Sequence, residues 1–380
     1  MLIAVPTEVN PDEKRVAATP ETVKKYCASG YQVLVQKGAG SGAYFPDSDY
    51  EVVGAKLAES GAELYGQADI ILKVKGPDKD ELRQMVKNTV LVGMLAPATN
   101  PLIQAYAEKG LTCFSLELLP RISRAQNMDV LSSQANIGGY KAVLLAAQYY
   151  ERFFPLLMTA AGTVKPARVL ILGAGVAGLQ AIATARRLGA MVEVFDVRPA
   201  VKEQVESLGA KFVEVETESE EDAETSGGYA REMSEEYKQK QAQLIQERAI
   251  DADIIITTAL IPGKPAPRLI SENTVREMKP GSVIVDMAVE MGGNCTLSEM
   301  DQVVVRHGVT LIGVGNIPAL MATDASQLYA RNLFNFLTPM LAEDGGVLNI
   351  NLEDEVINAS LLCKDGELLT PQSGNQGGKQ

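Results

Sequence analysis

Short apolar runs alternate with helical patterns along most of this chain. Runs typical of buried strands occupy residues 2–5, 32–35, 70–74, 90–94 and 112–115, and a second series occupies residues 168–172, 191–195, 254–257, 282–286 and 310–313. Helical patterns such as residues 20–29 and 179–188 lie between them. This alternation is typical of parallel sheets covered by helices. It predicts an α/β protein with two Rossmann-like, doubly wound parallel-sheet domains.

Two segments indicate how these domains connect. Residues 136–150 are rich in Ala and Leu and predict a long helix that crosses from the first domain to the second. Residues 325–337 have a helical pattern that predicts a return to the first domain. We therefore expect an N-terminal domain that is discontinuous in sequence, of residues 1–131 plus 318–380, and a second domain of residues 132–317.

One acidic segment, beginning near residue 214, breaks the alternation before a charged helical stretch that ends near residue 248. It is too long for an ordinary strand–helix connection. It is either a solvated surface insertion or a mobile loop that closes over a ligand, with Tyr229 as its apolar lid residue. Residues 370–380 are rich in Gly, Gln and Ser and predict a disordered tail.

Composition narrows the classes of function. The net charge of −13 argues against sequence-independent nucleic-acid binding, which needs a basic surface. The four cysteines lie far apart, which predicts no metal site and reduced thiols in a cytoplasmic protein. No apolar run approaches the about 18 residues of a membrane span. The N-terminus is expected to be a first strand and not a signal peptide.

The strand at 168–172 leads into a dinucleotide-binding fingerprint, Gly173-Ala174-Gly175-Val176-Ala177-Gly178, and a helical pattern follows. Gly173 permits the tight turn, Gly175 lets the backbone approach a pyrophosphate, and Gly178 lets helix and strand pack closely. The helix N-terminus then offers free N–H groups to the phosphates. A second glycine group, Gly38 to Gly42, has the wrong spacing and no clean helix after it, so we interpret it as a structural turn.

Asp196 ends the next apolar strand, about 20 residues after the turn, where a carboxylate accepts the adenosine ribose hydroxyls. A carboxylate there also repels a 2′-phosphate, which favours NAD(H). Arg198 leaves NADP(H) open, because an arginine nearby can accept that phosphate.

The acid–base group of an ordinary nicotinamide dehydrogenase is missing. Such an enzyme usually keeps a His or Lys to move a proton, yet the one histidine, His307, lies in a charged turn between two strands and is interpreted as a surface residue. A hydride that passes between two nicotinamides needs no proton transfer, only contact between the rings.

A second unusual stretch, residues 120–134, holds ionic and polar side chains between two apolar regions. Arg121, Arg124, Gln126 and Asp129 belong either to a solvated loop or to a ligand-facing loop at the domain junction.

Taken together, the sequence closely resembles the NAD(H)-binding subunit, domain I, of proton-translocating nicotinamide nucleotide transhydrogenase. The resemblance covers at least about residues 1–340. It depends most on residues 120–129, 159–164, 196–209, 257–267, 285–290 and 292–295.

The resemblance implies a Re/Si-specific enzyme that is active only with its partner subunits. Arg121, Gln126, Asp129 and Ser132 match a loop that presents the nicotinamide to the NADP(H)-binding domain of a partner. Tyr229 matches a mobile loop that closes on the nucleotide. The NAD(H)-binding residues would be Gly173, Ala174, Gly175, Val176, Ala177, Gly178, Asp196, Val197, Arg198, Gly228, Tyr229, Thr258, Ala259 and Leu260.

The resemblance also implies the setting of the chain. Family members are homodimers, and partner subunits carry the membrane helices and the proton path. We therefore expect a cytoplasmic protein, peripheral on the inner face of the bacterial cytoplasmic membrane.

The alternative is an alanine dehydrogenase-like NAD-dependent amino-acid dehydrogenase, which shares the fold. In that family an arginine and a lysine at the Arg15 and Lys75 positions hold the substrate. This chain has Ala96 at the position of that family's catalytic histidine and Glu290 at its aspartate position. We expect Arg15 and Lys75 to be held in structural ion pairs. A non-catalytic NAD sensor is the third hypothesis.

Overall fold

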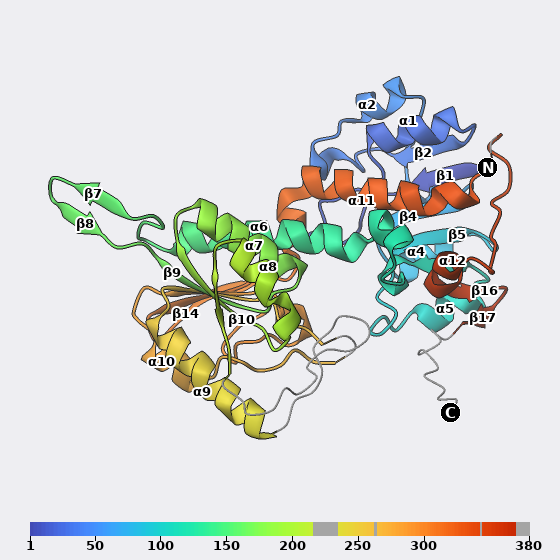
Figure 1. Ribbon diagram of the computed structural model, residues 1–380. Coiled ribbons are helices and arrows are strands. Elements are labelled where there is room, and N and C mark those ends of the chain that lie inside the picture. Colours follow the sequence, from blue (N-terminus) through green and yellow to red (C-terminus); the bar gives the residue numbers. More distant parts are fainter. Residues whose placement is uncertain (216–234, 262–263, 343, 370–380) are drawn as a thin grey trace, which may run out of the picture. The chain divides into compact units, whose positions relative to one another are not determined.

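The computed structural model describes residues 1–215, 235–261, 264–342 and 344–369. It divides into two units, Met1–Gln134 with Ala319–Gln380, and Ala135–Pro318. Each unit has its own large β-sheet (Figure 1). The predicted fold class is therefore confirmed, including the discontinuity of the first unit. Residues 216–234, with Gly228 and Tyr229, and the tail 370–380 lie outside the described residues.

The sheet of the first unit has the strand order β17-β16-β6-β5-β4-β1-β2-β3. Its strands are β1 (Leu2–Val5), β2 (Gln32–Gln36), β3 (Lys56–Ala58), β4 (Ile70–Lys75), β5 (Val90–Met94), β6 (Thr112–Ser115), β16 (Leu361–Lys364) and β17 (Glu367–Leu368). Strands β1 to β6 are parallel, whereas β16 runs antiparallel to β6 and β17 antiparallel to β16. The antiparallel edge comes from the chain segment that returns to this unit.

Helices cover both faces of this sheet. The helices are α1 (Pro20–Ala28), α2 (Asp47–Val52), α3 (Gly61–Tyr65), α4 (Lys79–Gln84), α5 (Ile103–Glu108), α11 (Ala322–Leu337) and α12 (Glu355–Ser360), with 3-10 turns at Ser41–Ala43, Leu116–Leu118, Ser123–Met128, Ile317–Met321 and Thr338–Met340. One core contains buried side chains of α1, α2, α11 and α12, and the other contains those of α3, α4 and α5. The strands supply alternate residues to the two cores, as a doubly wound sheet requires.

The second unit has a sheet of order β11-β10-β9-β12-β13-β15-β14, in which only β14 is antiparallel. Its strands are β9 (Arg168–Leu172), β10 (Met191–Phe195), β11 (Lys211–Val213), β12 (Ile254–Thr257), β13 (Val283–Asp286), β14 (Gln302–Arg306) and β15 (Val309–Gly313). The chain starts in the middle at β9, moves to one edge, and then returns to build the other side. This is the strand order of a dinucleotide-binding Rossmann fold.

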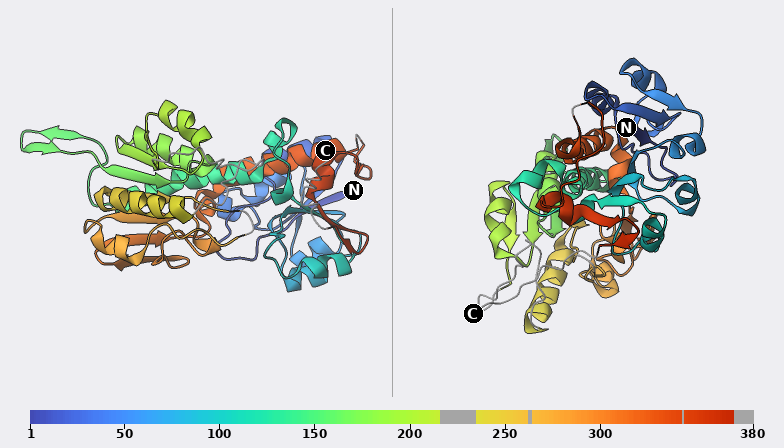
Figure 2. Two further views of the ribbon diagram at one scale, coloured as in Figure 1. Left: turned by 60° about the horizontal axis from the view of Figure 1, so that its bottom comes forward. Right: turned by 90° about the vertical axis from the view of Figure 1, so that its right-hand side faces the viewer.

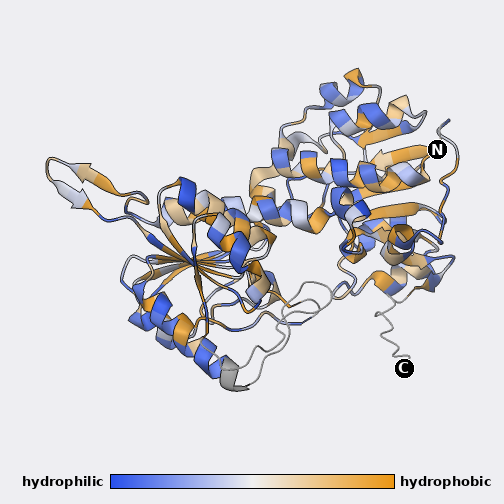
Figure 3. Ribbon diagram, viewed as in Figure 1, coloured by the Kyte–Doolittle hydropathy of each residue, from blue (hydrophilic) through white to orange (hydrophobic). Residues whose placement is uncertain are grey.

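Two helical layers enclose the second sheet. The helices are α6 (Val130–Tyr149), α7 (Val176–Arg187), α8 (Lys202–Ser207), α9 (Glu235–Asp251) and α10 (Glu272–Glu277), with 3-10 turns at Pro199–Val201 and Val289–Met291. Buried side chains of α6, α7 and α8 pack on one face, and those of α9 and α10 on the other. The strands are hydrophobic along most of their length, whereas α9 is largely hydrophilic (Figure 3).

A separate two-stranded hairpin, β7 (Leu157–Thr159) and β8 (Gly162–Val164), extends away from the seven-stranded sheet of this unit (Figure 2). Its apolar side chains are exposed, with 75% of Met158 and 55% of the preceding Leu156 accessible to solvent. A two-stranded hairpin alone is at best marginally stable in water. Among the described helices, none has both the length and the apolarity to span a membrane.

Candidate functional site

The glycine turn has the geometry that its spacing predicts. Gly173 has φ 105° and donates its N–H to the Phe195 carbonyl at 2.8 Å. A Cβ atom on Gly178 would lie 1.9 Å from the Gly173 carbonyl oxygen, and one on Gly173 would lie 2.5 Å from Thr258 Oγ1. The turn therefore excludes side chains at both ends, because strand, helix and the loop after β12 meet there.

Gly175 differs from the other two glycines. No heavy atom lies within 4 Å of the place where its Cβ would stand, so the backbone is open there. Gly175 is also the N-cap of α7, which has no side-chain cap and no acidic residue in its first turn. The open backbone at the positive end of a 12-residue helix fits a pyrophosphate. Of the remaining turn residues, Ala174 is buried and Val176 exposed.

The glycines at 38 to 42 lack this opening. A Cβ on Gly40 would lie 2.6 Å from the Phe45 carbonyl oxygen, and one on Gly42 would lie 2.9 Å from that of Lys14. Because backbone fills the space around both residues, the prediction of a structural turn is confirmed.

Asp196 follows β10, as expected, and its carboxylate is already fully bonded. Oδ2 accepts the Ala174 N–H at 2.7 Å and Arg198 Nη2 at 2.8 Å, and Oδ1 accepts the Arg198 N–H and Nε, both at 2.9 Å. A carboxylate has about four acceptor positions. Arg198 must therefore turn away before a ribose hydroxyl can bond to Asp196. Val197, between them, is partly buried against the core on the α9 face.

The loop after β12 supports the glycine turn from the next strand. Thr258 donates through Oγ1 to the Gly173 carbonyl at 3.1 Å. Ala259 exchanges two hydrogen bonds with the buried Asn294 side chain, at 3.2 and 2.9 Å. Leu260 is 47% exposed. The sequence reasoning named these loop residues but missed the role of Asn294.

Asp286 is a second supporting residue that the sequence reasoning missed. Its fully buried carboxylate accepts the backbone N–H groups of Ala288, Asn294 and Cys295 at 2.9 to 3.1 Å, and also the Thr257 hydroxyl. A polar residue at the carboxyl end of a buried strand, followed by two glycines, is the signal that could have identified it.

The polar stretch after β6 lies in the first unit and is a loop only as far as Asp129. The predicted loop extended to Ser132, but α6 begins at Val130, so Ser132 lies in the first turn of a helix. Asp129 caps that helix: it accepts the Ser132 N–H at 2.9 Å and the Ser132 hydroxyl at 2.5 Å. An Asp at this position satisfies N–H groups that have no partner within the helix. Arg121 and Gln126 are exposed.

Other residues of this stretch fix it to the unit. Arg124 forms a bidentate ion pair with Asp354, at 2.5 and 2.9 Å, and that pairing lowers the pKa of Asp354 to about 2. The Asn127 carbonyl accepts the side-chain amides of Asn332 and Asn335 at 2.8 and 3.0 Å. Arg124 therefore has a structural partner, whereas Arg121 and Gln126 face outward.

The arginine at the alanine dehydrogenase substrate position is held as expected. Arg15 is buried and pairs with Glu13 at 2.6 Å through Nη2, and its Nη1 donates to Gln134 at 2.8 Å. The expectation of a structural ion pair for Lys75 is wrong, because within the described part of the chain Lys75 has none.

The lysine two residues earlier forms that ion pair. Lys73 is fully buried, with its Nζ 2.7 Å from Glu81 and 3.4 Å from Glu8. Burial opposes the charge of Lys73, but the two carboxylates outweigh it and raise its pKa. Burial also raises the pKa of Glu8, although Lys73 opposes that shift.

The positions of the dehydrogenase acid–base groups carry no such pair here. Ala96 has φ 52°, and its N–H donates to Glu117 at 2.7 Å. Glu290, in the other unit, is exposed. His307 has φ 52° in the tight turn between β14 and β15 and lies 3.2 Å from Glu272, which confirms a surface turn residue.

The fold and the glycine turn define a Rossmann-type dinucleotide-binding protein, and comparisons with known proteins give its family. The description "Alanine dehydrogenase/PNT, N-terminal domain" matches residues 4–138, and "Alanine dehydrogenase/PNT, C-terminal domain" matches residues 142–371. The chain belongs to the alanine dehydrogenase/PNT family.

Individual relatives divide within this family. The chain is 51% identical to the first of the two alpha-subunit polypeptides of the NAD(P) transhydrogenase of Rhodospirillum rubrum, over 99% of this chain and 100% of that protein. It is similar in structure to a transhydrogenase from Sinorhizobium meliloti, with a TM-score of 0.87 and 47% identity over 97% of this chain and all of that one. The alanine dehydrogenase of Halomonas elongata is 30% identical, over 97% of this chain and 94% of its own length.

Proposed function

We propose that this chain is the NAD(H)-binding subunit of a proton-translocating, Re/Si-specific NAD(P)+ transhydrogenase. The observation that carries the proposal is the end-to-end match, at 51% identity, to a protein named as the first portion of the alpha subunit of an NAD(P) transhydrogenase. The lower identity to alanine dehydrogenase and the alanine at position 96 favour the same conclusion.

The second unit would hold NAD(H) with its own backbone. The open Gly175 and the N-terminus of α7 receive the pyrophosphate, because N–H groups and the helix dipole favour negative charge there. Asp196 accepts the ribose hydroxyls once Arg198 has turned away. Thr258, Ala259 and Leu260 line the edge of the turn, and the segment with Gly228 and Tyr229 closes over the nucleotide.

The first unit would orient the reacting end. The bound nicotinamide supplies the hydride, which goes to NADP+ on a partner subunit. Arg121 and Gln126 stand exposed on the segment that would face that partner. Asp129 and Ser132 hold each other at the start of α6, so their oxygen atoms are fixed in place. These residues position the rings and move no proton, because direct hydride transfer requires only contact.

The partners follow from the same proposal. The chain would work with an NADP(H)-binding domain and with membrane subunits that move protons, on the inner face of the bacterial cytoplasmic membrane. It would form a homodimer, and the exposed apolar hairpin β7–β8, with Met158 at 75%, supports self-association since such a hairpin gains stability by packing.

A mixing assay separates this function from its rivals. The purified chain, NADH and a separately purified NADP(H)-binding domain should reduce NADP+ much faster than either protein alone. A free-standing amino-acid dehydrogenase would instead reduce NAD+ with alanine and no partner. A sensor would bind NADH without turnover in either assay. No gain in rate on mixing would reject the proposal.

A further inference from the structure

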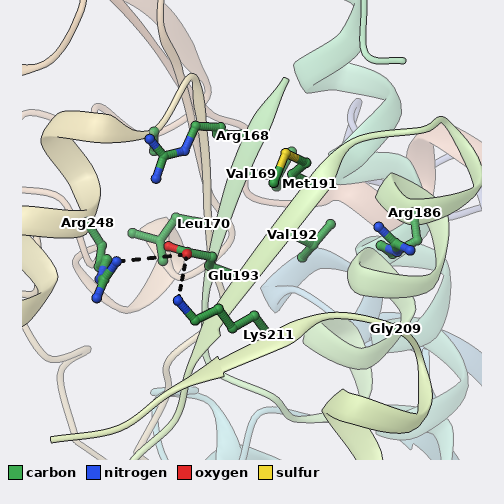
Figure 4. A pocket seen from close by; sticks show the side chains of 11 residues that line it. Arg168, Val169, Leu170, Arg186, Met191, Val192, Glu193, Gly209, Lys211 and Arg248 are labelled. Atoms are coloured by element: carbon green, nitrogen blue, oxygen red, sulfur yellow. Dashed lines mark ion pairs between the residues drawn. The ribbon is translucent and has the colours of Figure 1, made fainter. Parts of the chain in front are cut away.

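A cavity lies at the amino-terminal end of the second unit's sheet, on the opposite side of the strands from the glycine turn. Its volume is about 250 Å³ (Figure 4). Arg168, Met191 and Lys211, the first residues of β9, β10 and β11, line it. The glycine turn follows the last residue of β9. Since a strand rises about 3.3 Å per residue, the two ends of β9 are roughly 13 Å apart.

Four cationic side chains from four elements line this cavity. Arg168 comes from β9, Arg186 from α7, Lys211 from β11 and Arg248 from α9, and Glu193 is the one acidic residue of the lining. Such a concentration of positive charge is unusual in a chain whose net charge is −13. Figure 4 shows Arg248 and Lys211 directed toward Glu193 from opposite sides.

Strand register places most of these groups on one face. Arg168 is opposite Met191, and Glu193 is opposite both Leu170 and Lys211. Residues paired in this way share a face of the sheet. This is the face that α9 covers, because Leu170 is buried with the α9 residues of one core. Arg168, Lys211 and Arg248 therefore converge on one space.

The cations are only partly compensated by the protein. Arg168 pairs with Asp251 at 3.2 Å. Glu193 Oε1 is 3.5 Å from Lys211 Nζ and 3.9 Å from Arg248 Nη1, which is too long for good hydrogen bonds. Arg248 Nε is buried and has no hydrogen-bond partner among the described residues. Buried N–H groups almost always have a partner. An acceptor inside the cavity would supply it.

The rest of the lining is apolar and selects the kind of anion. Leu170, Met191, Val192 and Ala252 contribute apolar surface beside the cations. Guanidinium groups bind phosphate through paired N–H bonds, and a phosphate monoester carries a charge of about −1.5 to −2 at neutral pH. We propose that this cavity binds a small phosphate monoester, with its phosphoryl group on Arg248, Lys211 and Arg168 and its apolar part against Met191 and Leu170.

Calorimetric titration of the full chain with phenyl phosphate, in the presence of saturating NADH, tests this site. We expect saturable binding of one molecule per chain, with inorganic phosphate weaker because it has no apolar part. Benzoate, which has one negative charge, should bind about tenfold more weakly. Absence of saturable binding, or equal binding of benzoate, would overturn the proposal.

Variants locate the site. Arg248→Gln should weaken phenyl phosphate binding about tenfold and leave NADH affinity within about twofold. Lys211→Gln, at an exposed position, gives the same test if Arg248→Gln fails to fold. Arg276→Gln is the matched control, because this exposed arginine pairs with Glu272 on α10 and does not line the cavity. Unchanged binding in the folded Arg248 and Lys211 variants would contradict the proposal.

Discussion

The Asp196 carboxylate accepts the backbone N–H of Ala174 at 2.7 Å. The residue proposed to hold the ribose is therefore bonded to the turn proposed to hold the pyrophosphate. A carboxylate fixed in this way needs no reordering when a nucleotide arrives. The mobile element at this place is the Arg198 guanidinium, which occupies the other positions of the same carboxylate.

Replacing Asp196 tests the ribose assignment. Asp196→Ala should weaken NADH binding by about 1–3 kcal/mol, the usual effect of leaving polar groups of a bound ligand unpaired. Fluorescence titration with NADH measures this change. Arg198→Met is the matched control: it frees the Asp196 oxygens, so NADH affinity should stay the same or increase. Unchanged affinity in Asp196→Ala would mean that another group binds the ribose.

Two glycines of the turn should respond in opposite ways. Gly175→Val adds a side chain in open space, so the unfolding temperature should stay close to that of the parent while NADH binding is lost. Gly178→Ala places a Cβ 1.9 Å from the Gly173 carbonyl oxygen and should destabilise the unit by about 1–3 kcal/mol. Thermal unfolding and NADH titration of both variants check this, and a Gly175→Val chain that still binds NADH would refute the pyrophosphate assignment.

Asp129 combines two roles that substitution can separate. Asn is as good a helix cap as Asp, whereas Ala is not, so Asp129→Ala should lose about 1 kcal/mol of stability and Asp129→Asn almost none. Both variants remove the charge that is proposed to orient the reacting end. We therefore expect both to slow hydride transfer in the mixing assay at least tenfold. A fast Asp129→Asn enzyme would leave Asp129 with the capping role only.

The buried Lys73 should govern the pH dependence of stability. Lys73→Met leaves Glu8 and Glu81 without their cation and should cost about 3–5 kcal/mol near neutral pH. Without Lys73, these buried carboxyls bind protons more tightly in the folded than in the unfolded state. The variant should therefore lose further stability as pH rises above about 4.3, the ordinary glutamate value.

Urea unfolding at pH 5 and pH 8 measures this dependence. Lys75→Met, two residues along the same strand, should change stability by no more than about 0.5 kcal/mol, because Lys75 has no ion pair among the described residues. Equal losses in the two variants would contradict the role given to Lys73.

Apolar periodicity was enough to predict the central strands but not the edges of the sheets. The runs at β1, β5, β6, β9 and β10 agree with the structure residue for residue, because buried parallel strands consist almost entirely of apolar residues. Strands β3 and β11 were missed, since Lys56 and Lys211 begin short, half-exposed segments. Their strand conformation depends on pairing with a neighbour, which no local pattern records.

The candidate site was predictable where one residue type is required and not where contacts decide. Gly173, Gly175 and Gly178 follow from the turn geometry alone. The start of α6 was placed six residues late, because the capping bond of Asp129 was not recognised in its polar surroundings. The structural lysine was assigned to Lys75 instead of Lys73, since only the fold brings Glu8 and Glu81 to one lysine.

Direct transfer between two nicotinamides is the central claim, and an isotope experiment tests it most directly. NADH carrying deuterium at both C4 positions is mixed with this chain and an NADP+-loaded partner domain in ordinary water, and the NADPH formed is analysed by mass spectrometry. The account predicts one deuterium in every NADPH molecule, because no acid–base group or solvent proton intervenes. NADPH without deuterium, or no NADPH at all, would contradict it.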